Sequence, residues 1–127
     1  MEQVPGAPFG RDVSNLPADI ERLYQEARDC MKACAYTCAV LACRKMLLHV
    51  AVNMGAPIEN LKFVQCVDYL ETRGYVPPNA RGWIDRIRDK GNEANHEINI
   101  MSKQEAEDII SLVEMLLMIV YDYPSRA

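Results

Sequence analysis

The sequence has no hydrophobic stretch long enough to cross a bilayer. Its most apolar run, Ile109 to Tyr121, contains Glu114 and is shorter than the roughly 20 residues that a spanning helix needs. The first residues, Met1 to Pro8, have neither the basic start nor the apolar core of a secretory signal. We therefore predict a cytoplasmic protein without a membrane span, whose five cysteines are free thiols.

Positive charge is also scarce. The chain has 14 Lys and Arg residues against 18 Asp and Glu residues, a formal net charge of −4, which argues against a protein that coats nucleic acid by bulk charge but allows a local basic patch. One segment has a local excess of basic residues, namely Arg73, Arg81, Arg86, Arg88 and Lys90 against Glu71, Asp85 and Asp89. It is either a solvated helix face or a nucleic-acid-binding patch, for which Lys90, Arg86 and Arg81 are the candidates.

Patterns that bind metals are missing. Zinc sites pair their ligands as C-x2-C, whereas the clustered cysteines are four, four and five residues apart, at Cys30, Cys34, Cys38 and Cys43. This spacing favours cysteines that act as small apolar side chains between packed helices. Glu93 and His96 have the i, i+3 spacing of a di-iron bundle, but the other histidine, His49, has Met46 at that position. We predict no metal and no cofactor.

Strand-like alternation is short, and internal repeats are absent, so the sequence predicts a single all-α domain of four to five helices over residues 16–127. Half of the residues are hydrophobic and a quarter are charged, as in globular proteins. Residues 1–15 are rich in Pro and Gly and have no periodicity. We predict a flexible arm for them.

Helix boundaries are marked clearly in several places. A helix is predicted from about Pro17, capped by Ser14 or Asn15, and a break near Ala33 to Thr37 separates it from a buried helix over 35–53. Gly55 ends that helix, and Gly74 ends the next one, over 58–73. A fourth helical stretch begins near residue 79.

The last helix has the strongest start signal, because Ser102-Lys-Gln-Glu105 forms a capping box. Its apolar stripe consists of Ala106, Ile109, Ile110, Val113, Leu116, Leu117 and Val120, and the pattern ends at Pro124. Leu112, Met115 and Met118 lie off this stripe, which makes the helix apolar nearly all round. One bundle can bury such a helix, but a second apolar face also suits a homodimer.

Polar side chains recur at successive turns between Arg88 and His96. Asn92 and His96 are spaced i, i+4, and Arg88 precedes Asn92 by one turn, so the three share a face if the segment is helical. Histidine exchanges protons near neutral pH, and arginine and asparagine bind phosphate oxygens. The same residues also suit a structural role, in which Asn92 and His96 hydrogen-bond a neighbouring helix around Gly91.

Four segments resemble a known bacterial family, catalogued as domain of unknown function 4145. They are Leu16-Pro-Ala-Asp19, Tyr24-Gln-Glu-Ala27, Ala39-Val-Leu-Ala-Cys-Arg-Lys-Met-Leu47 and Ile87-Arg-Asp-Lys-Gly-Asn-Glu-Ala-Asn-His96. The resemblance extends over about residues 16–123. The family is in turn similar to the HEPN superfamily of helical, nucleic-acid-associated domains.

The resemblance implies an up-and-down, HEPN-like helical bundle that forms dimers. Active HEPN proteins cleave RNA without metal through an R-x(4–6)-H motif, in which histidine handles protons and arginine stabilises phosphate charge. His96 matches that histidine and Asn92 matches the polar residue that follows the arginine. Gly91 stands at the arginine's own position. Arg88 lies upstream of the usual spacing but could reach the same phosphate from one turn away. Lys90 has a suitable spacing and could replace the arginine, although lysine lacks the bidentate guanidinium.

Two functional hypotheses follow. The first is a non-catalytic helical homodimer that contacts its copy through apolar helices, binds RNA or a partner protein, and acts in bacterial defence or regulation. The second is a metal-independent, toxin-like endoribonuclease that uses His96 with Asn92 and Arg88. The acidic balance and the missing arginine favour the first hypothesis, and the phosphate-suited residues support the second.

Overall fold

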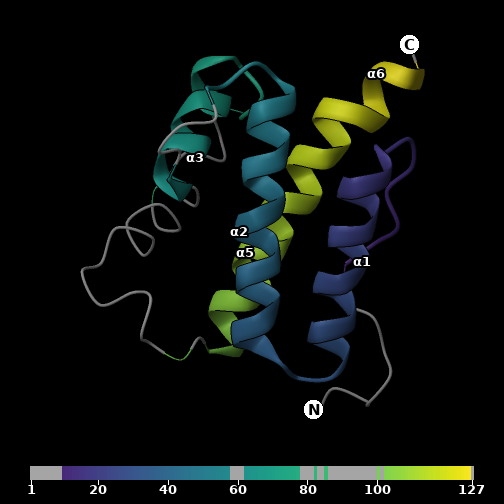
Figure 1. Cartoon of the computed structure of the whole chain (residues 1–127), viewed down its shortest axis with the longest axis vertical. Helices are drawn as coiled ribbons and strands as arrows, with labels where there is room; N and C mark the ends of the chain where they lie inside the picture. Colours follow the sequence, from purple (N-terminus) through teal and green to yellow (C-terminus); the bar gives the residue numbers. More distant parts are fainter. Residues whose placement is uncertain are drawn as a thin grey trace.

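The computed structural model describes residues 10–57, 62–77, 82, 85, 100 and 102–126, among which there is no strand. The elements are α1 (Ala18–Lys32), α2 (Tyr36–Asn53), α3 (Phe63–Thr72), α5 (Lys103–Leu117), the π-helical turn η3 (Met118–Asp122) and α6 (Tyr123–Arg126). Helix α2 contacts α1, α3 and α5, so it is the central helix of the bundle (Figure 1). The predicted all-α fold is confirmed. Residues 1–9 of the predicted arm and nearly all of the helix predicted from residue 79 lie outside the described residues.

Helices α1 and α2 form a hairpin. The predicted break near Ala33 to Thr37 is confirmed, because α1 ends at Lys32 and α2 begins at Tyr36. Ala35 N donates to the Cys30 carbonyl at 2.7 Å and Cys34 N donates to the Met31 carbonyl at 3.0 Å. This pair of bonds is a Schellman motif, in which the residue after the helix adopts a left-handed conformation. Cys34 is that residue, with φ of +60°.

The predicted cap of α1 is wrong. Pro17 occupies the N-cap position and makes no side-chain cap bond, while its carbonyl accepts from Glu21 N at 2.8 Å. Asn15 instead adopts a left-handed conformation, with φ of +68°. Its Nδ2 donates to Asp122 Oδ1 at 3.4 Å, so this side chain joins the start of the bundle to its end.

Helix α2 ends where α3 packs against it. Gly55 (φ +107°) terminates α2 as predicted. The carbonyl of Met54 at this helix end accepts hydrogen bonds from Tyr69 of α3 and from Arg73, the C-cap residue of α3. Tyr69 Oη donates to it at 3.1 Å and Arg73 Nη2 donates to it at 3.0 Å. These bonds replace the water that the end of a helix otherwise needs.

Helix α5 begins at the predicted capping box. Glu105 N donates to Ser102 Oγ at 3.1 Å, and Ser102 N donates to Glu105 Oε1 at 2.9 Å. All seven residues of the predicted stripe are buried. Leu112, which lies off this stripe, is fully buried as well, so at this position the bundle itself covers the helix, the first of the two alternatives.

The chain stays helical beyond Pro124 because the helix widens before it. Proline has no N–H and its ring displaces the carbonyl four residues back. The π-helical turn η3 ends at Asp122, directly before α6, and Pro124 is the second residue of α6, which continues to Arg126. Among the described residues, no helix is both long and apolar enough to span a bilayer.

Candidate functional site

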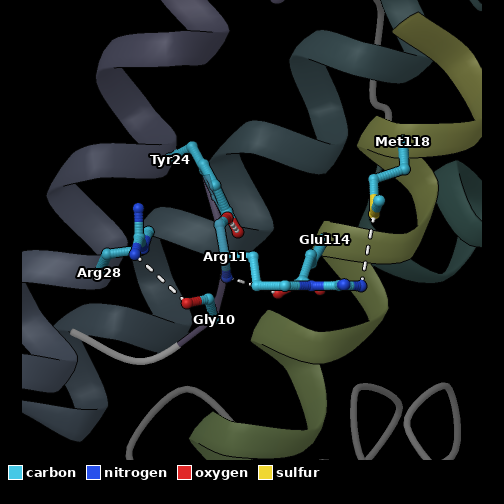
Figure 2. Close-up of polar contacts among 6 residues, drawn as sticks. All are labelled: Gly10, Arg11, Tyr24, Arg28, Glu114 and Met118. Carbon is cyan, nitrogen blue, oxygen red and sulfur yellow. Dashed lines mark hydrogen bonds and ion pairs between the residues drawn. The ribbon is translucent and has the colours of Figure 1, made fainter. Parts of the chain in front are cut away.

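The first described residues are held between α1 and α5 by a buried arginine (Figure 2). Arg28 on α1 is only 7% exposed, and a buried charge is stable only when it is paired and hydrogen-bonded. Its Nη1 binds the Asp12 carboxylate and its Nη2 donates to the Gly10 carbonyl at 3.2 Å. The guanidinium also lies 5.7 Å from the centroid of the Tyr24 ring. Arg28 therefore fixes the path of residues 10–12.

Tyr24 adds a second anchor to the same segment. It is fully buried and its Oη donates to the Arg11 carbonyl at 2.6 Å. Burial, and then the negative charge of Glu114, raise the pKa of the Tyr24 phenol. The phenol thus remains protonated and able to donate at physiological pH.

Arg11 in turn binds helix α5. Its backbone N donates to Glu114 Oε1 at 3.0 Å and its Nε lies 3.4 Å from Glu114 Oε2. Figure 2 also shows Arg11 reaching Met118, with Nη2 4.0 Å from Sδ. The Arg11 side chain is 75% exposed and that of Glu114 is 17% exposed. Arg11 of this segment and Glu114 of α5 therefore form an ion pair at the surface of the bundle.

A groove lies beside this pair. It has a volume of about 320 Å³ and is lined by Arg11, Pro77, Ser111, Glu114, Met115, Met118, Ile119 and Tyr123. Met115 at the end of α5, Met118 and Ile119 of η3 and Tyr123 of α6 form what we call the α5 face. Methionine adapts its shape to different partners, and the volume is at the lower end of the range for ligand sites. The groove suits an apolar side chain, with Arg11, Glu114 and Ser111 offering polar contacts.

A second polar cluster joins α1, α2 and η3. His49 Nδ1 lies 3.0 Å from Asp19 Oδ2, and Asn53 Nδ2 donates to Tyr121 Oη at 3.2 Å. The carboxylate of Asp19 fixes the orientation of the His49 ring through Nδ1. Sequence reasoning missed this cluster, although the i, i+4 spacing of His49 and Asn53 on a predicted helix pointed to a shared face.

The residues predicted to act on RNA lie outside the described residues, so their proximity stays a prediction. They are the proposed catalytic Arg88, Asn92 and His96 and the proposed binding residues Arg81, Arg86 and Lys90. Arg73, from the same basic segment, is described. Besides binding Met54, its guanidinium lies 5.2 Å from the centroid of the Tyr69 ring, so it holds α3 to the end of α2. The described residues contain no cluster of three or more His, Cys, Asp or Glu that could hold a metal ion.

These features define a small helical-bundle domain with a partly apolar groove beside an ion pair. A family model, the domain of unknown function DUF4145, matches residues 25–127. The chain therefore belongs to the DUF4145 family, as the sequence resemblance indicated. The match includes Arg28 and Glu114 but begins after Arg11 and Tyr24. No curated protein and no solved structure matches the chain.

Proposed function

We propose that this chain is a non-catalytic, HEPN-like helical module that forms a homodimer through the α5 face and binds RNA or a partner protein in bacterial defence or regulation. The HEPN relationship and the bacterial setting rest on the sequence resemblance alone. The observation that supports the dimer is the groove, in which Met115, Met118 and Ile119 are only partly covered.

A second copy of the chain is the occupant that the charges favour. In a two-fold dimer the same patch meets itself, so a patch of one sign would repel its copy. Arg11 and Glu114 give this patch both signs within 3.4 Å. Each protomer then contributes one cation, Arg11, and one anion, Glu114. The apolar side chains of the two α5 faces bury one another at the interface.

Light scattering at micromolar concentration tests the dimer. We expect twice the chain mass of 14.4 kDa for the wild type and the mass of one chain for Ile119→Glu, because a buried unpaired carboxylate opposes association. Leu41→Glu is the matched control, since Leu41 lies on α2, is 60% exposed and does not line the groove. A single-chain mass for the wild type, or equal dimerisation in Ile119→Glu, would eliminate the proposed interface.

A metal-independent endoribonuclease is the second candidate. The observation that favours it is the spacing of Arg88, Asn92 and His96 at successive turns, as the proton and phosphate chemistry of RNA cleavage requires. In this alternative His96 transfers protons, Arg88 stabilises phosphate charge and Asn92 orients the histidine or the phosphate.

Incubating the full chain with single-stranded RNA in excess chelator separates the two candidates. The non-catalytic proposal expects no cleavage by the wild type. His96→Ala and His49→Ala form a matched pair, because they replace the only two histidines in the chain. Cleavage that disappears in His96→Ala and persists in His49→Ala would establish the ribonuclease instead.

A further inference from the structure

Three of the five cysteines gather at the tip of the α1–α2 hairpin. Cys34 and Cys38 are exposed and Cys30 is half-buried, whereas Cys43 and Cys66 are buried. Burial raises the pKa of Cys43 to about 12 and that of Cys66 to about 11. Because the thiolate is the reactive form and an oxidant must reach it from solvent, the buried Cys43 and Cys66 are the least reactive thiols near neutral pH. Thiol chemistry in this chain therefore belongs to the hairpin tip.

The contact between Asp19 and His49 fixes which cysteines face each other. Their side chains meet at 3.0 Å across the two antiparallel helices. Cys30 follows Asp19 by eleven residues, and Cys38 precedes His49 by eleven residues. Eleven residues are three helical turns to within about 20°. Cys30 and Cys38 therefore lie on the same facing sides of α1 and α2, three turns closer to the tip.

The backbone at the tip brings these two positions close together. Only Ala33, Cys34 and Ala35 separate the helices, and Ala35 links both sides of the turn. Its N donates to the Cys30 carbonyl at 2.7 Å, and its carbonyl accepts from Ala39 N at 3.0 Å. The pKa of Cys30 is raised, first by burial and then by the neighbouring Cys38 thiol, which agrees with their proximity.

We propose that Cys30 and Cys38 are a redox-active thiol pair, which hydrogen peroxide converts into a disulfide between α1 and α2. The exposed Cys38 thiolate attacks one peroxide oxygen, the O–O bond breaks, and sulfenic acid forms while hydroxide leaves. The Cys30 thiolate then attacks the sulfenic sulfur, the S–S bond forms and a second hydroxide leaves. Two thiols lose two electrons, and one peroxide with the two thiol protons becomes two waters. A cellular thiol such as glutathione reverses the step by thiol–disulfide exchange.

Peptide mapping of the oxidised full-length chain tests this pair. The reduced chain is treated with equimolar hydrogen peroxide, remaining thiols are alkylated, and the protein is digested with trypsin without reductant. Cleavage after Arg28, Lys32 and Arg44 puts Cys30 into peptide 29–32 and Cys38 into peptide 33–44. We expect these peptides to be cross-linked, lighter by two hydrogens than their sum, and separated by reductant.

Peptide 33–44 also contains Cys34 and Cys43. Two variants, each at an exposed cysteine, therefore identify which cysteine of this peptide is bonded to Cys30. Cys38→Ser is expected to lose the cross-link and Cys34→Ser to retain it, and both should keep the helical circular dichroism of the wild type. A cross-link that persists in Cys38→Ser or disappears in Cys34→Ser would overturn the assignment. Oxidation of Cys38 to sulfinic acid without a cross-link would overturn the proposal, as would loss of helical signal on cross-linking.

Discussion

Replacing Cys34 by glycine should stabilise the chain, because this cysteine occupies a position that favours glycine. Three helices end in the same Schellman motif, with the residue after the helix in a left-handed conformation. At the ends of α2 and α3 that residue is Gly55 or Gly74, with φ of +107° and +85°. At the end of α1 it is Cys34, with φ of +60°.

The expected gain is the difference between two backbone effects. A residue with a Cβ destabilises the folded state by about 1–2 kcal/mol when it adopts the left-handed conformation. Glycine avoids this cost but gives the unfolded chain additional freedom, which removes about 0.4–1 kcal/mol of stability. The change also removes the hydrogen bond between the Cys34 thiol and the Tyr36 hydroxyl, which raises the pKa of that hydroxyl. Cys34 is exposed and this hydrogen bond therefore contributes little, so the two backbone effects decide a net gain of roughly 0.5–1 kcal/mol.

Urea unfolding with reductant present measures this gain. The slope for small domains is about 1–3 kcal/mol per molar urea, so the midpoint should rise by a few tenths of a molar at unchanged slope. Cys34→Ala is the control, because it removes the thiol but keeps the left-handed cost. If Cys34→Gly were no more stable than Cys34→Ala, the backbone explanation would be refuted.

Three further outcomes are expected in equilibrium unfolding experiments. Gly74→Ala should lower the free energy of unfolding by about 0.5–1 kcal/mol from the same two backbone effects, since its new Cβ meets nothing within 4 Å. Gly55→Ala should lower it further, because its Cβ would lie 3.0 Å from Tyr69 Oη; equal losses would contradict this. Tyr24→Phe should lower the free energy of unfolding by about 1 kcal/mol, because the Arg11 carbonyl loses the 2.6 Å hydrogen bond from Tyr24 Oη. An unchanged urea midpoint would contradict this. Burial raises the pKa of Cys66 from 9.0 to about 11, so its contribution to stability is complete below pH 9 and is lost as the pH rises through 11. The free energy of unfolding should fall across that range, less steeply in Cys66→Ala, and equal slopes would exclude this thiol as a cause.

Local signals in the sequence predicted most of the described helices. The capping box at Ser102 places two hydrogen-bonding side chains three residues apart, so its geometry follows from adjacent residues alone. The end of α2 at Gly55 is equally local, because the left-handed position there belongs to a single residue. These features need no knowledge of neighbouring helices, and for that reason they were predicted correctly.

Features that depend on distant residues were missed. Asn15 has the chemistry of a helix cap, but the carboxylate of Asp122, which is distant in sequence, accepts its amide instead. Leu112 lies off the apolar stripe by periodicity, and the sequence left open whether the bundle or a second copy covers it; in the structure the bundle buries it fully. Periodicity gives the angular position of a side chain on its helix, but the packing of neighbouring elements decides how much of the helix they cover.

The contacts around Arg28 show how far sequence reasoning could have reached at the candidate site. Arg28 is one turn after Tyr24, within the buried side of α1, and a cation at such a position requires an anion and other acceptors nearby. That requirement was visible in the sequence. The identity of the anion was not, because 18 acidic residues were available and the path of residues 10–17 has no periodicity to orient it. Asp12 is selected because Tyr24 and Glu114 hold the backbone of Arg11 between them, and that arrangement exists only once α1 and α5 have packed.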